Sequence, residues 1–492
     1  MSNYISRHYA GIANAIGSVL IVAGFLMITP LIGILFYPDQ IVHLKAFLIP
    51  SGIVLALGLA LRVLFRPDSS ISLSIQDGGI IVLVSWSLVV IFSALPFMEV
   101  LGFSFSRAVF ESMSGWTTTG LSVVDVSTAG AVILLWRSIM QFAGGAGLAI
   151  IMLSSIMGTG GVGISNAEGR SDQLLPHVRK SARLVLFIYF SYAIAGISAY
   201  KLVGMSYFDA VNHSFAAIST GGFSTYSDSI GHWDSVSIEA ITIVLMLLGN
   251  LSFITAWSLW RGRLKTVSRN PEVRLVSILL PIIIPLIVVV TTLPIYPTLE
   301  KSVRVGVFET ISALTTTGFS TVGYQNWNPF GLGVMIILML IGGGTYSTAG
   351  GIKQFRIHYM IKFILWEIRS YLLPKSTVAD RYIWEGDRKA YVDDAYTKPI
   401  VVFIFLYLSI FLIGVLVLSA CEFSLQDSLF EFASALGTVG LSIGATSYAM
   451  PSLALWVETI AMFLGRLEIV VVITSLCKIK QDCISLITRD LR

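Results

Sequence analysis

The twelve residues VFETISALTTTG (307–318) end in three threonines and a glycine, in a part of the chain that carries few charges. Three other stretches share this shape and align with it on their last glycine. Each of the four follows one apolar run and precedes another, so the chain repeats a unit of span, short segment and span. Internal repetition of this kind indicates an architecture before any single motif does. The related stretches are VFESMSGWTTTG (109–120), VNHSFAAISTGG (211–222) and LFEFASALGTVG (429–440).

The composition is that of a membrane protein. The 492 residues are 55% hydrophobic and 12% charged, whereas soluble domains carry about 25% charged residues. Because runs of about 20 apolar residues are candidate membrane helices, we expect an all-α polytopic membrane protein with about ten transmembrane helices. The apolar runs are 11–37, 45–65, 78–98, 130–157, 183–204, 236–260, 273–295, 330–365, 399–420 and 452–477.

The repeated segments are too short, at about twelve residues, to cross a bilayer. Such a segment can enter the membrane and return if its irregular backbone is buried in protein or faces a water-filled cavity. Four equivalent copies therefore predict four pore loops around one pore, each between two spans. The predicted divisions are two additional N-terminal transmembrane helices (1–75), pore unit 1 (76–170), pore unit 2 (171–270), pore unit 3 with an intramembrane gating loop and a cytoplasmic loop (271–397), and pore unit 4 (398–492).

The positive charges predict the orientation of the chain. Most of the 32 lysines and arginines fall in segments that share one side of the membrane if the N-terminus is cytoplasmic. The positive-inside bias then sets both termini in the cytoplasm and every repeated segment on the outer side. The basic inner loops are also suited to contact anionic membrane lipid or an acidic protein surface. We expect no nucleic-acid partner.

The glycine-ended tails fit the chemistry of a cation filter. A dehydrated cation needs oxygen ligands, and glycine allows backbone torsions that turn successive carbonyls toward one axis. Rings of such carbonyls form the filters of potassium channels, and Thr-Val-Gly at 438–440 is the triplet found there. A glycine after a threonine run can also simply end a helix, but four copies at one place in a repeat favour the filter. The candidate ion-binding residues are Thr118, Thr119, Gly120, Thr220, Gly221, Gly222, Thr316, Thr317, Gly318, Thr438, Val439 and Gly440.

Nine residues before the four glycines stand Glu111, His213, Glu309 and Glu431. The three glutamates begin the pore segments, and a helix dipole stabilises carboxylates at a helix N-terminus. Alternatively, the glutamates raise the local cation concentration at an outer mouth. A protonated histidine at the second position would weaken that attraction for cations.

In these motifs, the chain from about residue 75 to its end resembles the Trk/Ktr/HKT superfamily of potassium transporters. Members carry four span–pore-loop–span units with one filter glycine each, and the two additional N-terminal spans are most similar to the TrkH branch. The resemblance implies potassium uptake across the bacterial plasma (inner) membrane through a four-loop selectivity filter, with K+ as the transported ion. Members with serine at the first filter position often favour sodium, so Gly120 implies a preference for potassium. The second loop departs from the family pattern at His213.

A glycine-rich segment, LIGGGTYSTAGGIK (340–353), interrupts the long apolar run 330–365. Its five glycines do not hold a stable helix interior, and a broken helix at membrane depth must line a cavity or be packed in protein. A kink for packing and a flexible gate are the two interpretations, and the resemblance implies an intramembrane gating loop. The candidate residues of this loop are Gly342, Gly343, Gly344, Thr345, Ser347, Gly350 and Gly351.

Arg466 places a charge inside the last apolar run, at a cost of roughly 3 kcal/mol or more, which marks a functional site. Glu468 lies two residues further on and therefore on a different helix face. Below a cation filter, Arg466 would be an electrostatic barrier or a latch for the 342–351 loop. Its alternative role is to pair with an outer carboxylate and hold helices together. The family has an arginine at this place, which favours the gate, and Asn250 is a weaker candidate for the same constriction.

The longest inner segment, 353–398, mixes basic, acidic and aromatic residues. It could be a solvated loop, but the resemblance implies a docking surface for a cytosolic regulatory ring of the TrkA/KtrA type, on a transporter that is a homodimer. The chain has no Walker motif and no GxGxxG between a strand and a helix. We therefore expect no cofactor in this chain and a nucleotide (ATP/ADP or NAD) on the partner subunit.

Three functions compete. The first is a channel-like potassium conductor that the partner gates. The second is a secondary symporter that couples K+ to H+ or Na+, which needs a second ion site near the middle of the membrane. Only Arg466 clearly qualifies, and an arginine does not deprotonate in proteins. The third is a membrane enzyme, which we do not expect because the six histidines are scattered and none pair at metal-ligand spacing.

Overall fold

The computed structural model describes residues 2–65, 74–147, 178–374, 381–385 and 388–490. Helices dominate these residues, together with one small antiparallel hairpin. In that hairpin β1 (Tyr382–Glu385) pairs with β2 (Arg388–Tyr391), and Tyr382 lies opposite Tyr391. The end of the expected 130–157 run and the expected boundary between pore units 1 and 2 lie outside the described residues.

The helices after the N-terminal part come in four groups, each with a long helix, a short pore helix and a second apolar helix. The N-terminal part holds α1 (Ser2–Ile28), η1 (Thr29–Leu35), η2 (Pro38–His43) and α2 (Leu44–Leu64). The first group is α3 (Ile75–Leu101), α4 (Phe105–Trp116) and α5 (Ala131–Gly145). The second is α8 (Val178–Leu202), α9 (Tyr207–Ile218), η4 (Ser229–Trp233) and α10 (Val236–Asn250), followed by α11 (Phe253–Trp260) and α12 (Leu264–Arg269). The third is α13 (Pro271–Ile287), η5 (Val288–Thr292), α14 (Leu299–Leu314) and α15 (Pro329–Ile341), followed by α16 (Gln354–Leu372). The fourth is α17 (Asp394–Ala420), α18 (Leu425–Gly437) and α19 (Ser452–Leu467), followed by α20 (Ile469–Asp490).

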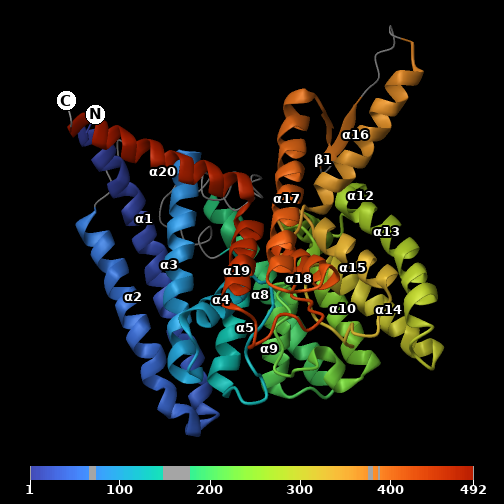
Figure 1. The fold of residues 1–492 in the computed structure, drawn as a ribbon, viewed down its shortest axis with the longest axis horizontal. Coiled ribbons are helices and arrows are strands. Elements are labelled where there is room, and N and C mark those ends of the chain that lie inside the picture. Colours follow the sequence, from blue (N-terminus) through green and yellow to red (C-terminus); the bar gives the residue numbers. More distant parts are fainter. Residues whose placement is uncertain (1, 66–73, 148–177, 375–380, 386–387, 491–492) are drawn as a thin grey trace.

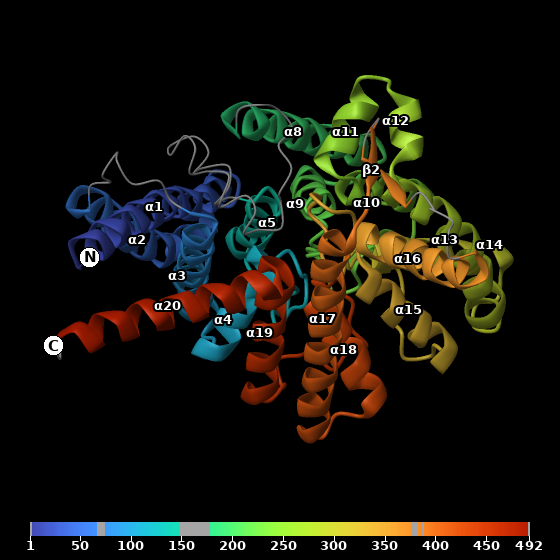
Figure 2. The same ribbon diagram turned by 90° about the horizontal axis from the view of Figure 1, so that it is seen from above.

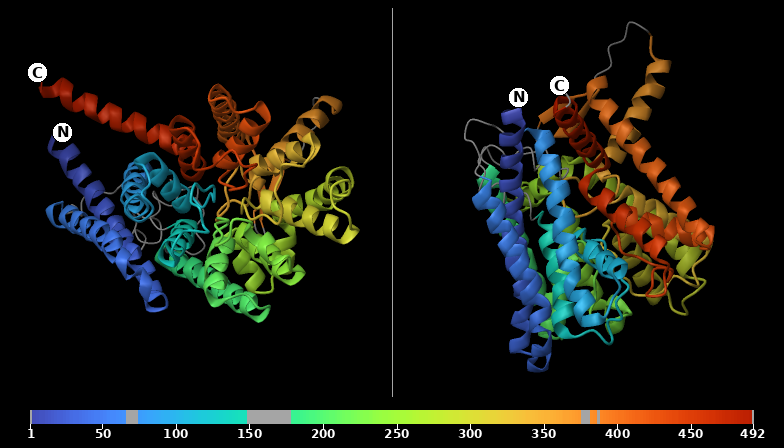
Figure 3. Two further views of the ribbon diagram at one scale, coloured as in Figure 1. Left: turned by 60° about the horizontal axis from the view of Figure 1, so that its bottom comes forward. Right: turned by 60° about the vertical axis from the view of Figure 1, so that its left-hand side comes forward.

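The four groups surround a central set of loops. In the left view of Figure 3 the cyan, green, yellow and orange-to-red groups lie around the centre, with α1 and α2 outside them. Figure 1 shows the N- and C-terminal ends close together on one face of the molecule. From above, α20 runs away from α19 and past α3 (Figure 2), and its Asp482 accepts a hydrogen bond from Tyr9 of α1 at 2.8 Å.

Six of the described helices are long and apolar enough to cross a membrane, and two bent helix pairs raise the number to as many as eight. The sequence places single spans at 236–260 and 452–477, but each of these runs is broken. The axes of α10 and α11 differ by 114°, and those of α19 and α20 by 98°. Ser252 starts the new helix α11 by accepting a hydrogen bond from the N–H of Thr255, and Glu468 adopts a left-handed φ of +63° between α19 and α20.

The apolar helix that follows each pore loop ends at an equivalent place in its group. These helices end at Gly145, Asn250, Ile341 and Leu467. The sequence predicts a break only in the third group, where glycines are frequent. The structure instead shows a break in all four groups, because each of these helices ends shortly beyond the central loops.

Small residues hold α1 and α2 close together, as they do in many membrane helix pairs. A Cβ atom added at Gly58 would lie 2.8 Å from the carbonyl oxygen of Gly17 and 2.9 Å from the backbone nitrogen of Ile21. A Cβ atom added at Gly17 would lie 2.7 Å from the carbonyl oxygen of Gly58. Gly52, on the same helix α2, has no atom within 4 Å of its added Cβ. The interface therefore requires glycine at positions 17 and 58.

Gly58→Leu should force α1 and α2 apart and lower the thermal unfolding temperature of the detergent-purified protein, because overpacking an interface costs about 1–3 kcal/mol. Gly52→Leu adds the same side chain to the same helix in open space and should leave that temperature unchanged. Equal shifts in the two variants would contradict the close packing at Gly58.

Candidate ion pathway

Four glycines, one from each pore loop, form a closed ring at the centre of the molecule. We call Gly120, Gly222, Gly318 and Gly440 the glycine ring; their φ angles are +96°, +71°, +81° and +97°. A Cβ atom on any of them would overlap a carbonyl oxygen of the next loop in chain order, and the fourth loop closes onto the first. The carbonyls that would be overlapped are those of Gly221, Thr317, Val439 and Thr119. The backbones therefore touch directly, and a side chain at these four positions has no room.

Two residues before each glycine, a threonine leaves the pore helix in a left-handed conformation. The φ angles of Thr118, Thr220, Thr316 and Thr438 are +58°, +51°, +52° and +50°. The next residue donates its N–H to a carbonyl five residues back, as Val439 does to Ser434 at 2.8 Å, which is the pattern of a Schellman helix end. The left-handed threonine thus ends the pore helix and also leads the chain directly into the ring glycine. A residue other than glycine pays about 1–3 kcal/mol for this conformation, and strain of this size gathers at functional sites.

The pore helices α4, α9, α14 and α18 all end at the glycine ring. A helix C-terminus carries about half a negative charge, which favours a cation close by. The hydroxyls of Thr118 and Thr438 are buried and have no hydrogen-bond partner among the described residues. Unpaired hydroxyl oxygens beside four helix C-termini are suited to bind a cation.

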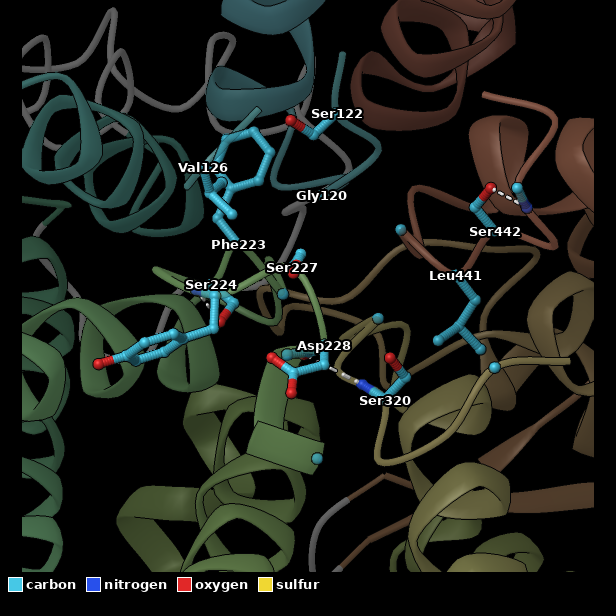
Figure 4. A pocket seen from close by; sticks show the side chains of 18 of the residues that line it. Gly120, Ser122, Val126, Phe223, Ser224, Ser227, Asp228, Ser320, Leu441 and Ser442 are labelled. Carbon is cyan, nitrogen blue, oxygen red and sulfur yellow. Dashed lines mark hydrogen bonds between the residues drawn. The ribbon is translucent and has the colours of Figure 1, made fainter. Parts of the chain in front are cut away.

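A cavity of about 560 Å³ opens onto the glycine ring, and all four glycines line it. Figure 4 shows serines of all four loops around this cavity, namely Ser122, Ser224, Ser320 and Ser442. The charged groups in its lining are Asp125, Asp228 and Arg137. The four left-handed threonines are at most 1% exposed. The glycine ring therefore forms the floor of the cavity, and the threonines lie behind it.

Behind the threonines, residues 342–353 form one irregular segment, here called the gate loop. Gly342 and Gly351 have φ angles of +70° and +77°, and a Cβ atom on either would overlap the backbone of the other. The N–H of Gly343 donates to the carbonyl of Gly350 at 3.1 Å. The two ends of the loop thus pack against each other, which the glycines permit.

The gate loop hydrogen-bonds directly to the left-handed threonines. The N–H of Gly350 donates to the hydroxyl oxygen of Thr316 at 2.8 Å. The hydroxyl of Thr220 donates to that of Thr348 at 3.1 Å. Thr348 in turn donates toward the carbonyls of Ile218 and Gly249, at 3.1 and 3.0 Å. The gate loop is therefore packed against the inner side of the candidate filter.

Asn250 and Glu272 hold the first half of the gate loop. The side-chain oxygen of Asn250 accepts from the N–H of Gly344 at 3.0 Å, and a carboxylate oxygen of Glu272 accepts from the N–H of Thr345 at 2.5 Å. Ser347 donates to the carbonyl of Gly344 at 2.6 Å within the loop. Asn250 and Glu272 are 3% and 7% exposed, respectively. The sequence singles out Asn250, but it gives no signal for Glu272, which lies at the start of a helix where acidic residues are common.

Arg466 fastens the gate loop to the first pore unit. Its guanidinium donates to the carbonyl oxygens of Thr348 and Gly144, each at 2.6 Å. Glu468 pairs instead with Arg356, at 2.8 Å, so Arg466 and Glu468 face different partners. The contacts of Arg466 fit a latch for the 342–351 loop, because one guanidinium joins α19, the gate loop and α5.

The carboxylates of Glu111, Glu309 and Glu431 lie inside the protein and are at most 1% exposed. They stand well inside their helices, so stabilisation at a helix N-terminus is the wrong explanation for them, and an effect on the local cation concentration stays a prediction. Each carboxylate accepts hydrogen bonds from the chain just after the glycine ring. The donors include Ser122 and Val123 for Glu111, Thr321 and Tyr324 for Glu309, and Ser442 and Ile443 for Glu431. These acids hold the outer ends of three pore loops.

His213 performs the same task in the second loop. Its Nδ1 lies 2.8 Å from the carbonyl oxygen of Asp209, and its Nε2 lies 2.9 Å from the hydroxyl of Ser224. Because a carbonyl only accepts, Nδ1 carries the hydrogen; Nε2 accepts from the hydroxyl of Ser224 when the ring is neutral and donates to it when the ring is protonated. The histidine therefore holds the second loop at Ser224, where the other loops are held by a carboxylate, and its contacts fit either protonation state.

The model of the TrkH family of cation transport proteins matches residues 43–486. The chain belongs to this family. A cation transporter of Methanocaldococcus jannaschii is 30% identical over 467 residues, with 94% of each chain covered. The Trk system potassium uptake protein TrkH of Halomonas elongata is 30% identical over 485 residues, which cover 94% of this chain and 97% of the relative. The crystal structure of the potassium transporter TrkH from Vibrio parahaemolyticus superposes with a TM-score of 0.83 at 26% identity, over 95% of this chain and 98% of that one.

Membership of the TrkH family confirms the expected all-α polytopic membrane fold. A functional residue that the sequence alone did not single out is Arg137, a buried residue of α5 that forms an ion pair with Glu111 at 2.8 Å. The signal was present, because a charged residue inside an apolar run marks a functional site as much at Arg137 as at Arg466.

Glu309→Gln should lower the thermal unfolding temperature of the purified protein, because the buried donors of Thr321 and Tyr324 lose part of their acceptor and an unsatisfied buried donor costs about 1–3 kcal/mol. Glu300→Gln is the matched control, since Glu300 lies on the same helix with its side chain 73% exposed. A temperature that is the same for both variants would contradict the holding role of Glu309.

Proposed function

We propose that the chain conducts K+ through the glycine ring, with ligands from the twelve candidate filter residues, and takes K+ up across a bacterial plasma (inner) membrane. The observation that carries this proposal is the closed ring of four backbone contacts, with four strained threonines behind it. Stacked rings of oxygens replace the hydration shell of a potassium ion. The names of the Halomonas and Vibrio relatives, which refer to potassium, support the choice of ion.

The gate loop closes the inner side of this pathway. It packs against the filter threonines, and Arg466 holds it to the carbonyl of Gly144. Conduction requires that this loop move, because it occupies the space directly behind the ring. A symporter that couples K+ to H+ or Na+ is the alternative. The buried carboxylates of the pore helices support this alternative, because ionisable groups at membrane depth serve in proton relays.

Partner proteins and orientation complete the proposal. Both ends of the chain lie on one face (Figure 1), which fits termini that are both cytoplasmic. On the same face α16 and the β1–β2 hairpin project from the molecule, and they offer a docking surface for a cytosolic TrkA/KtrA-type ring that carries the nucleotide. We expect a homodimeric transporter with no cofactor of its own.

Uptake of K+, Rb+ and Na+ into liposomes that hold this chain alone tests the function. Flux that runs down the potassium gradient and ignores a proton gradient supports a channel. Uphill potassium flux driven by a proton gradient establishes the symporter instead. Absence of any potassium flux from correctly folded protein, in the wild type and in Arg466→Gln alike, overturns the proposed function.

Gly120→Ser and Gly318→Ser should each lower the K+ over Na+ flux ratio by about tenfold, a loss of about 1.4 kcal/mol, because the new side chain displaces the neighbouring carbonyl. Gly204→Ser controls for backbone strain, since Gly204 has a φ of +97° but open space around its added Cβ. Ratios that stay at the wild-type value in both ring variants would remove the filter assignment.

Arg466→Gln should raise potassium flux in the absence of a partner, because the two carbonyls of Thr348 and Gly144 lose their shared donor. Arg466→Lys separates the two roles of the arginine. Lysine keeps the charge but not the two-pronged donor, so flux as high as in the glutamine variant identifies a latch, and low flux identifies an electrostatic barrier. A fall in flux for Arg466→Gln would contradict both.

A further inference from the structure

Glu458 of α19 is a fully buried acid next to another buried acid. Its carboxyl oxygens lie 3.3 and 3.5 Å from the hydroxyl of Thr446, and the same hydroxyl lies 2.7 Å from Glu431. Glu458 and Glu431 are 0% and 1% exposed. Two acids without access to bulk water thus share one hydroxyl group.

The hydrogen bonds assign a proton to one of the two acids. Glu431 accepts from four donors, so it is the ionised partner. These donors are Ser442 Oγ, Ile443 N, Ala445 N and Thr446 Oγ1. The single hydrogen of Thr446 points to Glu431, at the shorter distance, and its oxygen is left to accept. Glu458 offers a hydrogen to that oxygen only as a carboxylic acid.

A comparison within the chain shows what the position of Glu458 does in the first pore unit. Gly144 and Gly465 are equivalent, because a Cβ atom on each would overlap the carbonyl of the residue four places before the filter glycine of its unit, Trp116 or Leu436. Seven residues before these two glycines stand Arg137 and Glu458. Arg137 neutralises Glu111 through an ion pair of 2.8 Å. The fourth unit has an acid in place of that arginine.

The elements packed on α19 bring no cation to Glu458 among the residues that the structure describes. Helices α4, α17, α18 and α20 pack on α19, and Arg466 near its end reaches α5 and the gate loop. From α18 the facing group is Glu431, and the acid of α4, Glu111, is already paired with Arg137. The cation of α4, Arg107, lies instead over the ring of Tyr448 and donates to the carbonyl of that residue at 3.0 Å. Two charged residues of α17 lie at its N-terminal end, where its sequence begins Asp394-Ala-Tyr-Thr-Lys398, with the phenol of Tyr407 further along; those of α20 begin at Lys478. A proton is therefore the remaining means of neutralising the pair.

We propose that Glu458 is a proton-binding site that fixes the position of the fourth pore loop. This inference rests on the proposed function, because it assigns a control to the same candidate filter. With the proton bound, Thr446 bridges the two acids and residues 442–446 stay in place after Gly440, on the cavity side of the ring. Without it, two adjacent buried negative charges repel each other, and one hydroxyl hydrogen cannot serve both.

A chain of hydrogen-bonded groups connects this site to the cavity above the glycine ring. Ser442 lines that cavity and donates to Glu431 at 2.6 Å, and Glu431 is joined through Thr446 to Glu458. A proton taken from cavity water becomes the O–H hydrogen of Glu458, and its release returns it to that water. No other bond changes, so the step needs no co-reactant.

The test measures K+ and Na+ flux in liposomes that hold the full chain, while the pH on the cavity side is raised from about 6 to about 9, a range that spans the loss of a proton from a buried acid. The wild-type K+ over Na+ ratio should fall at least about threefold as the pH rises. Glu458→Gln should hold the low-pH ratio throughout, because its amide keeps a hydrogen donor toward Thr446. Glu99→Gln makes the same exchange at an exposed position of α3 and should follow the wild type. A wild-type ratio that does not change with pH, or a Glu458→Gln profile parallel to the wild type, overturns the proposal.

Infrared spectroscopy of the purified protein tests the proton without any transport. The wild type should show the C=O stretch of a buried carboxylic acid at neutral pH, and Glu458→Gln should lack it. If liposomes show no potassium flux but the band is present and sensitive to Glu458, the proposed function fails while the proton site stands. If flux is normal and the variant leaves the band unchanged, the proton site fails alone.

Discussion

Direct contact between the backbones of four loops is the constraint on which the rest of the structure depends. Each member of the glycine ring packs on a carbonyl of the next loop, so the ring closes only if all four positions lack a side chain. The left-handed threonines follow from this constraint, because the chain has to turn sharply from the end of a pore helix into the ring. Backbone of this kind survives at membrane depth only when protein satisfies its polar groups, and the pore helices supply that surrounding.

The loops beyond the ring are held by buried acceptors, and each unit provides its acceptor differently. The first unit combines Glu111 with Arg137, and the second uses the ring of His213. The third satisfies Glu309 with the phenol of Tyr324 and with Thr321, and the fourth places Glu458 beside Glu431. Burying an acid without partners is costly. Each unit therefore has to supply hydrogen-bond partners or an opposite charge for its buried polar group. The pore is thus fourfold in its backbone and asymmetric in its charges.

The repeat in the sequence predicts the ring glycines well, because a backbone that needs positive φ and close approach leaves glycine as a visible signal. The order in which the loops touch is not visible, since it depends on contacts between segments about a hundred residues apart. The bends after Asn250 and Leu467 are hidden for another reason: no proline and no run of glycines marks them, and each of the runs 236–260 and 452–477 is long enough to be read as one span. The rule that found Arg466, a charge inside an apolar run, also applies to Arg137 and Glu458. The role of Arg137 depends on Glu111 and that of Glu458 on Thr446. Each of these partners comes from another segment, so the sequence around Arg137 or Glu458 does not reveal it.

The contacts between the gate loop and the threonines mean that the two parts do not move independently. Gly350 and Thr348 bond to Thr316 and Thr220, so displacing the loop breaks a hydrogen bond to each of these two threonines. A buried hydroxyl or N–H left unsatisfied costs about 1–3 kcal/mol, which opposes opening. Water that enters behind the ring offsets this cost by supplying new partners. In the proposed function, opening of the loop and hydration of the ring on the side of the loop are therefore one event, and displacement of Arg466 also changes the ligands available to an ion at the threonines.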